Sequence, residues 1–121
     1  MPNEQRRRFS RIRFRTGARF SAGGAQRACE VVDLSMKGAL IGLAADATTP
    51  VGAPCVLEVA LAGSDAVIRM DCAVAHAEDG RIGVVWSEID LDSLTHLRRL
   101  VELNLGDPAL LKRELAALRA D

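Results

Sequence analysis

The sequence predicts a mainly β domain that is completed by one or two α-helices at its C-terminal end. Six short segments between residues 12 and 86 are rich in apolar and β-branched residues, and turns containing Gly, Pro, Asp or Ser separate them. Beyond residue 90 the apolar residues recur every three or four positions, which is the period of a helix. Six strands at this spacing are typical of an antiparallel barrel or sandwich, and 121 residues can form one hydrophobic core.

The strands are placed by their alternation. In the first strand, one face is apolar and the other is basic; the apolar face holds Ile12, Phe14, Ala18 and Phe20, and the exposed face holds Arg13, Arg15 and Arg19. The expected strands cover residues 12–20, 28–34, 39–43, 55–61, 66–77 and 81–86. Residues 23–24, 35–38, 63–65 and 78–80 are expected to form turns, and residues 44–54 a longer loop.

Two helices are expected after the strands. The first carries leucines and a valine at helical spacing between residues 94 and 105, and its candidate N-terminal caps are Asp90, Asp92 and Ser93. Gly106 ends it, and Asp107 with Pro108 starts a second helix whose single apolar stripe is Leu110, Leu111, Leu115 and Leu118. We expect this stripe to pack on the barrel or on the first helix, with partner binding as the alternative.

Composition and cysteine usage limit the class of protein. Aromatic residues make up only 3% of the chain, so the core should consist of Val, Leu, Ile and Ala. Cys29, Cys55 and Cys72 are widely spaced and odd in number, which argues against a disulfide framework and against a zinc site. No run of 18 apolar residues and no signal-peptide pattern is present, so we expect a cytoplasmic protein without membrane insertion.

The sequence offers little for catalysis. No serine or cysteine lies in a nucleophile motif, and His76 and His96 fall on different expected elements. Glu88, Asp90 and Asp92 could be considered as cation ligands, but carboxylates at a helix N-terminus are explained by capping and by the helix dipole. We therefore expect a protein that is not an enzyme and that needs no metal or cofactor.

Charge is strongly segregated along the chain. The formal net charge is zero, yet residues 1–20 contain seven arginines and one glutamate, so they carry +6 and the remainder carries −6. Four of these arginines, Arg6, Arg7, Arg8 and Arg11, lie in a polar stretch that we expect to be a mobile arm. The guanidinium group matches phosphate and also the O6 and N7 acceptors of guanine. The arm is therefore either a solvated tail or a site for an anion.

A second polar stretch, Asp33-Leu34-Ser35-Met36-Lys37-Gly38, lies between two expected strands. Asp33 can accept hydrogen bonds from an arginine or from guanine, and the Ser35 hydroxyl can bind a phosphate or a base. Gly38 leaves room for the backbone where a side chain would obstruct. Taken alone, this spacing is also typical of an ordinary turn.

In combination, the Arg7-x-x-x-Arg11 and Asp33-x-Ser35-x-x-Gly38 motifs resemble the signature of the PilZ domain. The segment 81–86 with the Leu/Arg-rich helix after it is similar to the end of the PilZ barrel, and the whole chain is most similar to small stand-alone members. The resemblance implies a six-stranded antiparallel barrel that binds cyclic di-GMP. It also implies a single domain over residues 1–121, with an arm (1–11), a barrel (12–88) and a helical tail (90–119).

The resemblance assigns roles to the motif residues. Arg7 and Arg11 would hold the guanines and phosphates, and Asp33, Ser35 and Gly38 would form the opposite wall on the barrel. Arg6 precedes the motif, which in this family accompanies two stacked, intercalated ligand molecules, and Arg8 would make supplementary contacts. His76 is a peripheral candidate that could lie under a base; the alternative is a partly exposed strand residue. Whether one or two ligands bind stays open.

The expected mechanism is a switch. Cyclic di-GMP would order the arm onto the barrel, and the new surface would be bound by an unidentified protein effector of a monomeric receptor. Two alternatives remain: a nucleic-acid-binding barrel that uses the basic arm, and a PilZ-like interaction module without a ligand. The −6 charge of residues 21–121 and the scarcity of aromatic residues make nucleic acid the less favoured partner.

Overall fold

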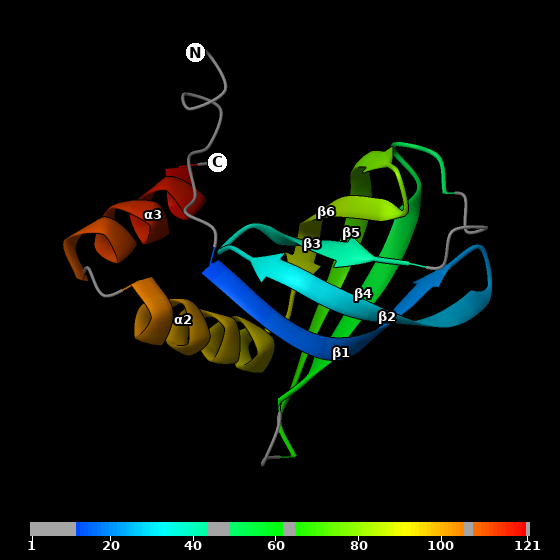
Figure 1. Cartoon of the computed structure of the whole chain (residues 1–121). Helices are drawn as coiled ribbons and strands as arrows, with labels where there is room; N and C mark the ends of the chain where they lie inside the picture. The colour runs from blue at the N-terminus through cyan, green and yellow to red at the C-terminus, as the bar shows by residue number, and fades with distance from the viewer. Residues whose placement is uncertain (1–11, 44–48, 62–64, 106–107, 121) are drawn as a thin grey trace.

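The computed structural model describes residues 12–43, 49–61, 65–105 and 108–120. Six antiparallel strands close into a barrel in the order β1-β2-β3-β6-β5-β4 (Figure 1). The strands are β1 (Ile12–Ala22), β2 (Ala25–Leu34), β3 (Gly38–Gly42), β4 (Pro54–Ala60), β5 (Val67–Glu78) and β6 (Arg81–Ile89), and two helices follow, α2 (Leu91–Leu105) and α3 (Pro108–Ala120). The predicted six-stranded barrel with C-terminal helices is confirmed, and the sandwich alternative is excluded.

Two tight hairpins extend several strands beyond the predicted limits. Gly23 and Gly24 join β1 to β2, and Asp79 and Gly80 join β5 to β6; all four have positive φ. Consecutive positive φ values are typical of the two-residue turns whose twist matches that of paired strands. Pairing therefore continues up to each turn, so that β2 begins three residues earlier than the predicted residue 28.

β2 contains a change of register that the simple alternation did not predict. Relative to β3, Val32 is an extra residue between the pairs Val31 with Ile41 and Asp33 with Leu40. As a result Val31 and Leu34 are both fully buried inside the barrel. Asp33, which lies between Val32 and Leu34, therefore faces outward, next to the turn that connects β2 with β3.

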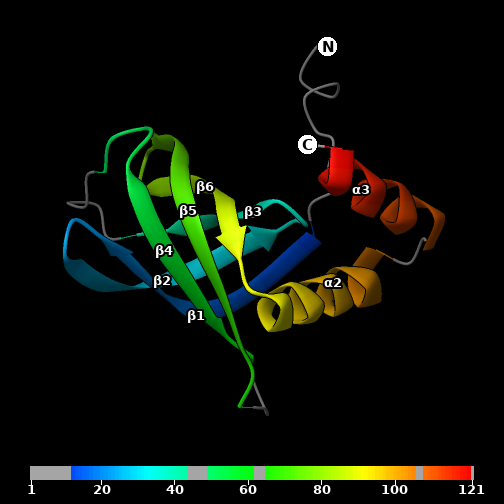
Figure 2. The same cartoon turned by 180° about the vertical axis from the view of Figure 1, so that it is seen from behind.

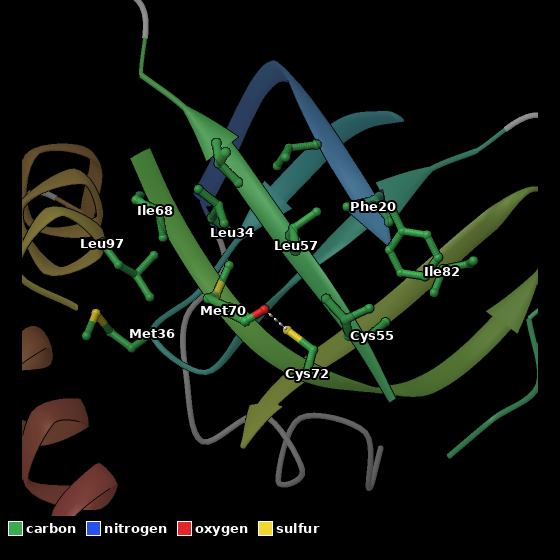
Figure 3. Packing of buried hydrophobic residues seen from close by; sticks show 14 of the residues in the cluster. Phe20, Leu34, Met36, Cys55, Leu57, Ile68, Met70, Cys72, Ile82 and Leu97 are labelled. Atoms are coloured by element: carbon green, nitrogen blue, oxygen red, sulfur yellow. Dashed lines mark hydrogen bonds between the residues drawn. The ribbon is translucent and has the colours of Figure 1, made fainter. Parts of the chain in front are cut away.

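The barrel interior is filled by aliphatic side chains and sulfur-containing residues, as the low aromatic content predicted. Phe20 is the one large ring among the fully buried side chains of the described residues. Figure 3 shows how these residues meet inside the barrel and that Leu97 of α2 approaches Met36 and Ile68 at one end. Leu97 and Val101 have no exposed surface, so α2 closes this end of the barrel.

The start of α2 is fixed by its cap. Asp90 accepts a hydrogen bond from the Ser93 backbone N–H at 2.9 Å, and Leu94 N–H donates to the Asp90 carbonyl. The Ser93 hydroxyl accepts the Arg69 backbone N–H of β5 at 2.9 Å, which ties the helix to the barrel. The hydrogen bonds from the Ser93 side chain and backbone lower the pKa of the Asp90 carboxyl. The helix thus begins at Leu91, and Asp90, one of the three predicted candidates, is its N-terminal cap.

α3 lies against α2, on the side away from the strands (Figures 1 and 2). Leu115 and Leu118 are half-buried against the core cluster, so part of the predicted stripe is used within the chain. Among the described helices, neither α2 nor α3 has the length and apolar content needed to cross a bilayer.

Candidate ligand-binding site

The turn between β2 and β3 is organised by the side chain of Ser35. Its hydroxyl oxygen accepts hydrogen bonds from the backbone N–H groups of Lys37 and Gly38, both at 3.2 Å, and its O–H donates to the Gly38 carbonyl at 3.4 Å. The Ser35 backbone N–H donates to the same carbonyl at 2.9 Å. One serine thus holds the turn closed from both its backbone and its side chain, in addition to the ligand contact that the resemblance implies.

Trp86 of β6 supports this turn from the barrel. Its indole Nε1–H donates to the Met36 carbonyl at 2.9 Å, and its backbone N–H donates to the Lys37 carbonyl at 3.0 Å. The Lys37 ammonium lies 4.2 Å from the centre of the Trp86 ring, a cation–π contact. Met36 has no exposed surface, and its side chain anchors the turn in the core near Leu97. These contacts make the turn rigid before any ligand arrives.

Gly38 is required by the close approach of β3 to β6. A Cβ atom at this position would collide with the Val84 carbonyl and would lie 3.0 Å from Cα of Val85. Both obstacles are backbone, so the clash could be relieved only by moving β6. The prediction that a side chain at position 38 would obstruct the backbone is confirmed. The obstructing group is the backbone of Val84 in β6, 46 residues further along the chain.

The outer face of the barrel beside the turn carries residues from four neighbouring strands. Four residues paired in register form a row across β2, β3, β6 and β5: Asp33, Leu40, Gly83 and His76. A Cβ on Gly83 would collide with the His76 imidazole and would lie 2.6 Å from its Nδ1, so this exposed ring covers the glycine backbone. Three strand spacings separate the ends of the row, about 14 Å along the surface.

A polar cavity of about 440 Å³ opens on the same outer face, two residues further along β3 and β6. Its lining includes Arg15 and Arg81, and glycines at positions 42 and 80 leave its floor open. Arg15 is paired with Glu30 at 3.6 Å, and both side chains are largely exposed. Exposed pairs of this kind contribute little to stability, so the Arg15 guanidinium can exchange Glu30 for another anion.

The described structure brings together part of the predicted site. Asp33, Ser35 and Gly38 meet at the β2–β3 turn, and His76 lies three strands away on the same outer face. Arg6, Arg7, Arg8 and Arg11 lie outside the described residues. Among the exposed arginines predicted for β1, Arg15 and Arg19 are confirmed as exposed.

Sequence reasoning missed three contributors to this surface: Trp86, Gly83 and Leu40. Trp86 could have been singled out because it is the only tryptophan in the sequence. Gly83, inside an otherwise apolar strand, was a signal for a close approach by another group. Within the described residues, no group of three His, Cys, Asp or Glu side chains is arranged to hold a metal ion.

The barrel order and the Asp-x-Ser-x-x-Gly turn between β2 and β3 define a small, closed six-stranded β-barrel domain. The PilZ domain model matches residues 5–103, and the chain belongs to this family.

Solved structures with the same fold include three PilZ proteins or relatives. The PilZ domain of CeSA from a cellulose-synthesizing bacterium has 20% identity and a TM-score of 0.61, over 80% of this chain and 96% of that one. The Bacillus subtilis inhibitor of motility MotI/DgrA has 18% identity and a TM-score of 0.67, over 81% of this chain and 53% of that one. Borreliella burgdorferi PlzA, solved in complex with c-di-GMP, has 16% identity and a TM-score of 0.56, over 73% and 38%. The chain thus spans about half or less of the last two proteins.

Proposed function

We propose that this chain is a receptor for cyclic di-GMP, with the ligand bound between the arginine arm and the outer face of β2, β3, β6 and β5. The observation that carries the proposal is the β2–β3 turn. Ser35 and Trp86 fix its geometry, and Gly38 allows β3 to approach the backbone of β6 closely beside it. Rigid donors and acceptors beside an open face reduce the ordering cost of binding.

Each part of the site has a task in this proposal. Arg7 and Arg11 bind phosphates and guanine edges, because a guanidinium forms paired hydrogen bonds with both. Asp33 accepts hydrogen bonds from guanine N1 and N2 or orients one of these arginines. The His76 ring, which lies flat over Gly83, offers a face on which a base can stack.

The proposal includes binding of a second ligand molecule on the same face. The Arg15 and Arg81 cavity extends the surface along β3 and β6 beyond the row that ends at Asp33 and His76. Two stacked molecules of cyclic di-GMP carry four phosphates, and Arg6 and Arg8 supply further positive charge for them. If Arg6 and Arg8 both contact phosphates, the expected stoichiometry is two molecules of cyclic di-GMP per chain.

The output in this proposal is a binding event and no reaction, in keeping with the role of PilZ domains as binding and regulatory modules. The ligand favours the arm in its closed position, so the population of that position rises with ligand concentration. The closed arm, the ligand and the neighbouring barrel edge form a new surface for a protein effector. The three cysteines are free thiols, which fits a reducing compartment, and we place the receptor in the cytoplasm.

Calorimetric titration with cyclic di-GMP tests the proposal. Charge-assisted hydrogen bonds contribute about 1.5–3 kcal/mol each, so Arg7→Ala or Arg11→Ala should weaken binding by about 10- to 150-fold. The matched control is Arg27→Ala, since Arg27 is exposed near the opposite end of β2 from the turn. Equal affinities for all three variants would reject the proposal, as would equal binding of GMP or of single-stranded oligonucleotides.

A further inference from the structure

Two of the free cysteines face each other inside the barrel. Cys55 of β4 and Cys72 of β5 are direct partners in the antiparallel register, and they are only 5% and 4% exposed. Each of the two thiols perturbs the pKa of the other. Figure 3 shows both side chains on the interior side of their strands, with Cys72 also donating to the Met70 carbonyl at 3.5 Å. Cys29 is half-buried on β2 opposite Ala18, so it has no cysteine as its register partner on β1.

The register allows these two thiols to become a disulfide without sliding either strand. Directly opposed residues of antiparallel strands have Cα atoms about 4.5–5.5 Å apart, and a disulfide needs about 4.4–6.8 Å. Oxidation would bring the two sulfurs to about 2.05 Å from each other.

The two sulfurs differ in their chemistry. The hydrogen bond from Cys72 lowers the pKa of Cys55, because it stabilises the Cys55 thiolate. The same hydrogen bond, together with burial, raises the pKa of Cys72. The thiolate is the reactive form of cysteine, so Cys55 is the attacking sulfur.

We propose that Cys55 and Cys72 form a reversible redox site that reacts with hydroperoxides. The Cys55 thiolate attacks the peroxide O–O bond and becomes a sulfenic acid, with one water or alcohol released after protonation. The Cys72 sulfur then attacks the sulfenic sulfur; its proton leaves with the hydroxyl group as water, and the disulfide forms. Two thiols lose two electrons in total, and one peroxide gains them. A thiol reductant reverses the step by exchange.

The redox site is connected to the β2–β3 turn by a single residue. Cys72 is the register partner of Trp86, beside an irregularity in the pairing of β5 and β6. Trp86 donates both of its N–H groups to the carbonyls of Met36 and Lys37. A shift of Cys72 therefore moves the group that fixes the turn, and oxidation should weaken ligand binding. This last step rests on the proposed function, whereas the thiol chemistry does not.

The first test follows the thiols of the folded full-length protein. After treatment with hydrogen peroxide, peptide mass spectrometry should show Cys55 linked to Cys72 with loss of two hydrogens, one remaining free thiol, and full recovery with dithiothreitol. The Cys29→Ser control should behave in the same way, and Cys55→Ser should form no intramolecular bond. Fluorescence of Trp86, the only tryptophan of the chain, should change in step with oxidation. The proposal would be overturned if all three cysteines remained free thiols after peroxide treatment. It would also be overturned if disulfides formed only through Cys29.

The second test measures the affinity for cyclic di-GMP in reduced and oxidised protein. The oxidised wild type and Cys29→Ser should bind severalfold more weakly than their reduced forms, and Cys55→Ser should not respond to peroxide. A disulfide with unchanged affinity would overturn the link to the turn. If the reduced protein does not bind cyclic di-GMP, the proposed function fails, while the mass and fluorescence results still decide whether the redox site exists.

Discussion

Replacing Ser35 by alanine tests whether the turn is held by the serine hydroxyl. The substitution removes the acceptor for the N–H groups of Lys37 and Gly38, each 3.2 Å from the oxygen. A hydrogen bond contributes about 0.5–1.5 kcal/mol, so two lost bonds should lower the free energy of unfolding by about 1–3 kcal/mol. For a domain of this length each kcal/mol corresponds to a decrease in Tm of about 4 °C.

Urea denaturation and thermal melting measure this change, and calorimetry with cyclic di-GMP measures its effect on binding. The matched control is Ser87→Ala: Ser87 is exposed, and its hydroxyl donates to the Asp71 carbonyl at 3.1 Å, outside the turn. The control should stay within about 0.5 kcal/mol of the wild type. A Ser35→Ala protein as stable as this control would refute the role assigned to the hydroxyl.

Four further substitutions test the other structural roles. Gly38→Ala should lower the free energy of unfolding by about 1–3 kcal/mol, because the new Cβ meets the backbone of β6. Gly83→Ala should lower it less, because the exposed His76 ring can rotate away. Equal decreases in urea denaturation would contradict this difference. Leu97→Ala should cost about 2–5 kcal/mol by leaving a cavity under α2, and a loss below 1 kcal/mol would mean that α2 does not close the barrel. Asp90→Ala should lower the Tm at neutral pH. The depressed pKa of Asp90 means that its contribution is present above the unfolded-state pKa and is lost as the pH falls through the folded-state value, so the two proteins should converge in acid; a constant difference would argue against the cap.

Local features of the fold could be predicted from the sequence because they depend on neighbouring residues. The Gly23-Gly24 and Asp79-Gly80 turns follow from the conformations that these residues favour. The Asp-x-Ser-x-x-Gly turn was likewise visible, since Ser35 binds backbone groups only two and three positions away. The change from strand to helical spacing also predicted α2, and Asp90 was among the predicted caps.

Features that depend on distant pairing could not be predicted. Trp86 donates to the Met36 carbonyl, which lies 50 residues earlier in the chain. Gly38 is required because the backbone of Val84, which is also distant in sequence, packs against it. His76 is exposed, in agreement with the expected partly exposed strand residue. The irregularity between Val74 and His76, which turns the ring outward opposite Gly83, could not be predicted. Only the closed barrel brings Asp33 and His76 to one surface.

The central claim is that the β2–β3 turn and the row from Asp33 to His76 form the binding face for cyclic di-GMP. Titration of isotope-labelled protein, followed by amide NMR, tests this claim most directly. The amide signals of Ser35, Gly38 and Gly83 should shift with ligand concentration, while that of Gly24 in the distant hairpin should not. Shifts confined to residues outside this face, or no shifts at saturating ligand, would contradict the account.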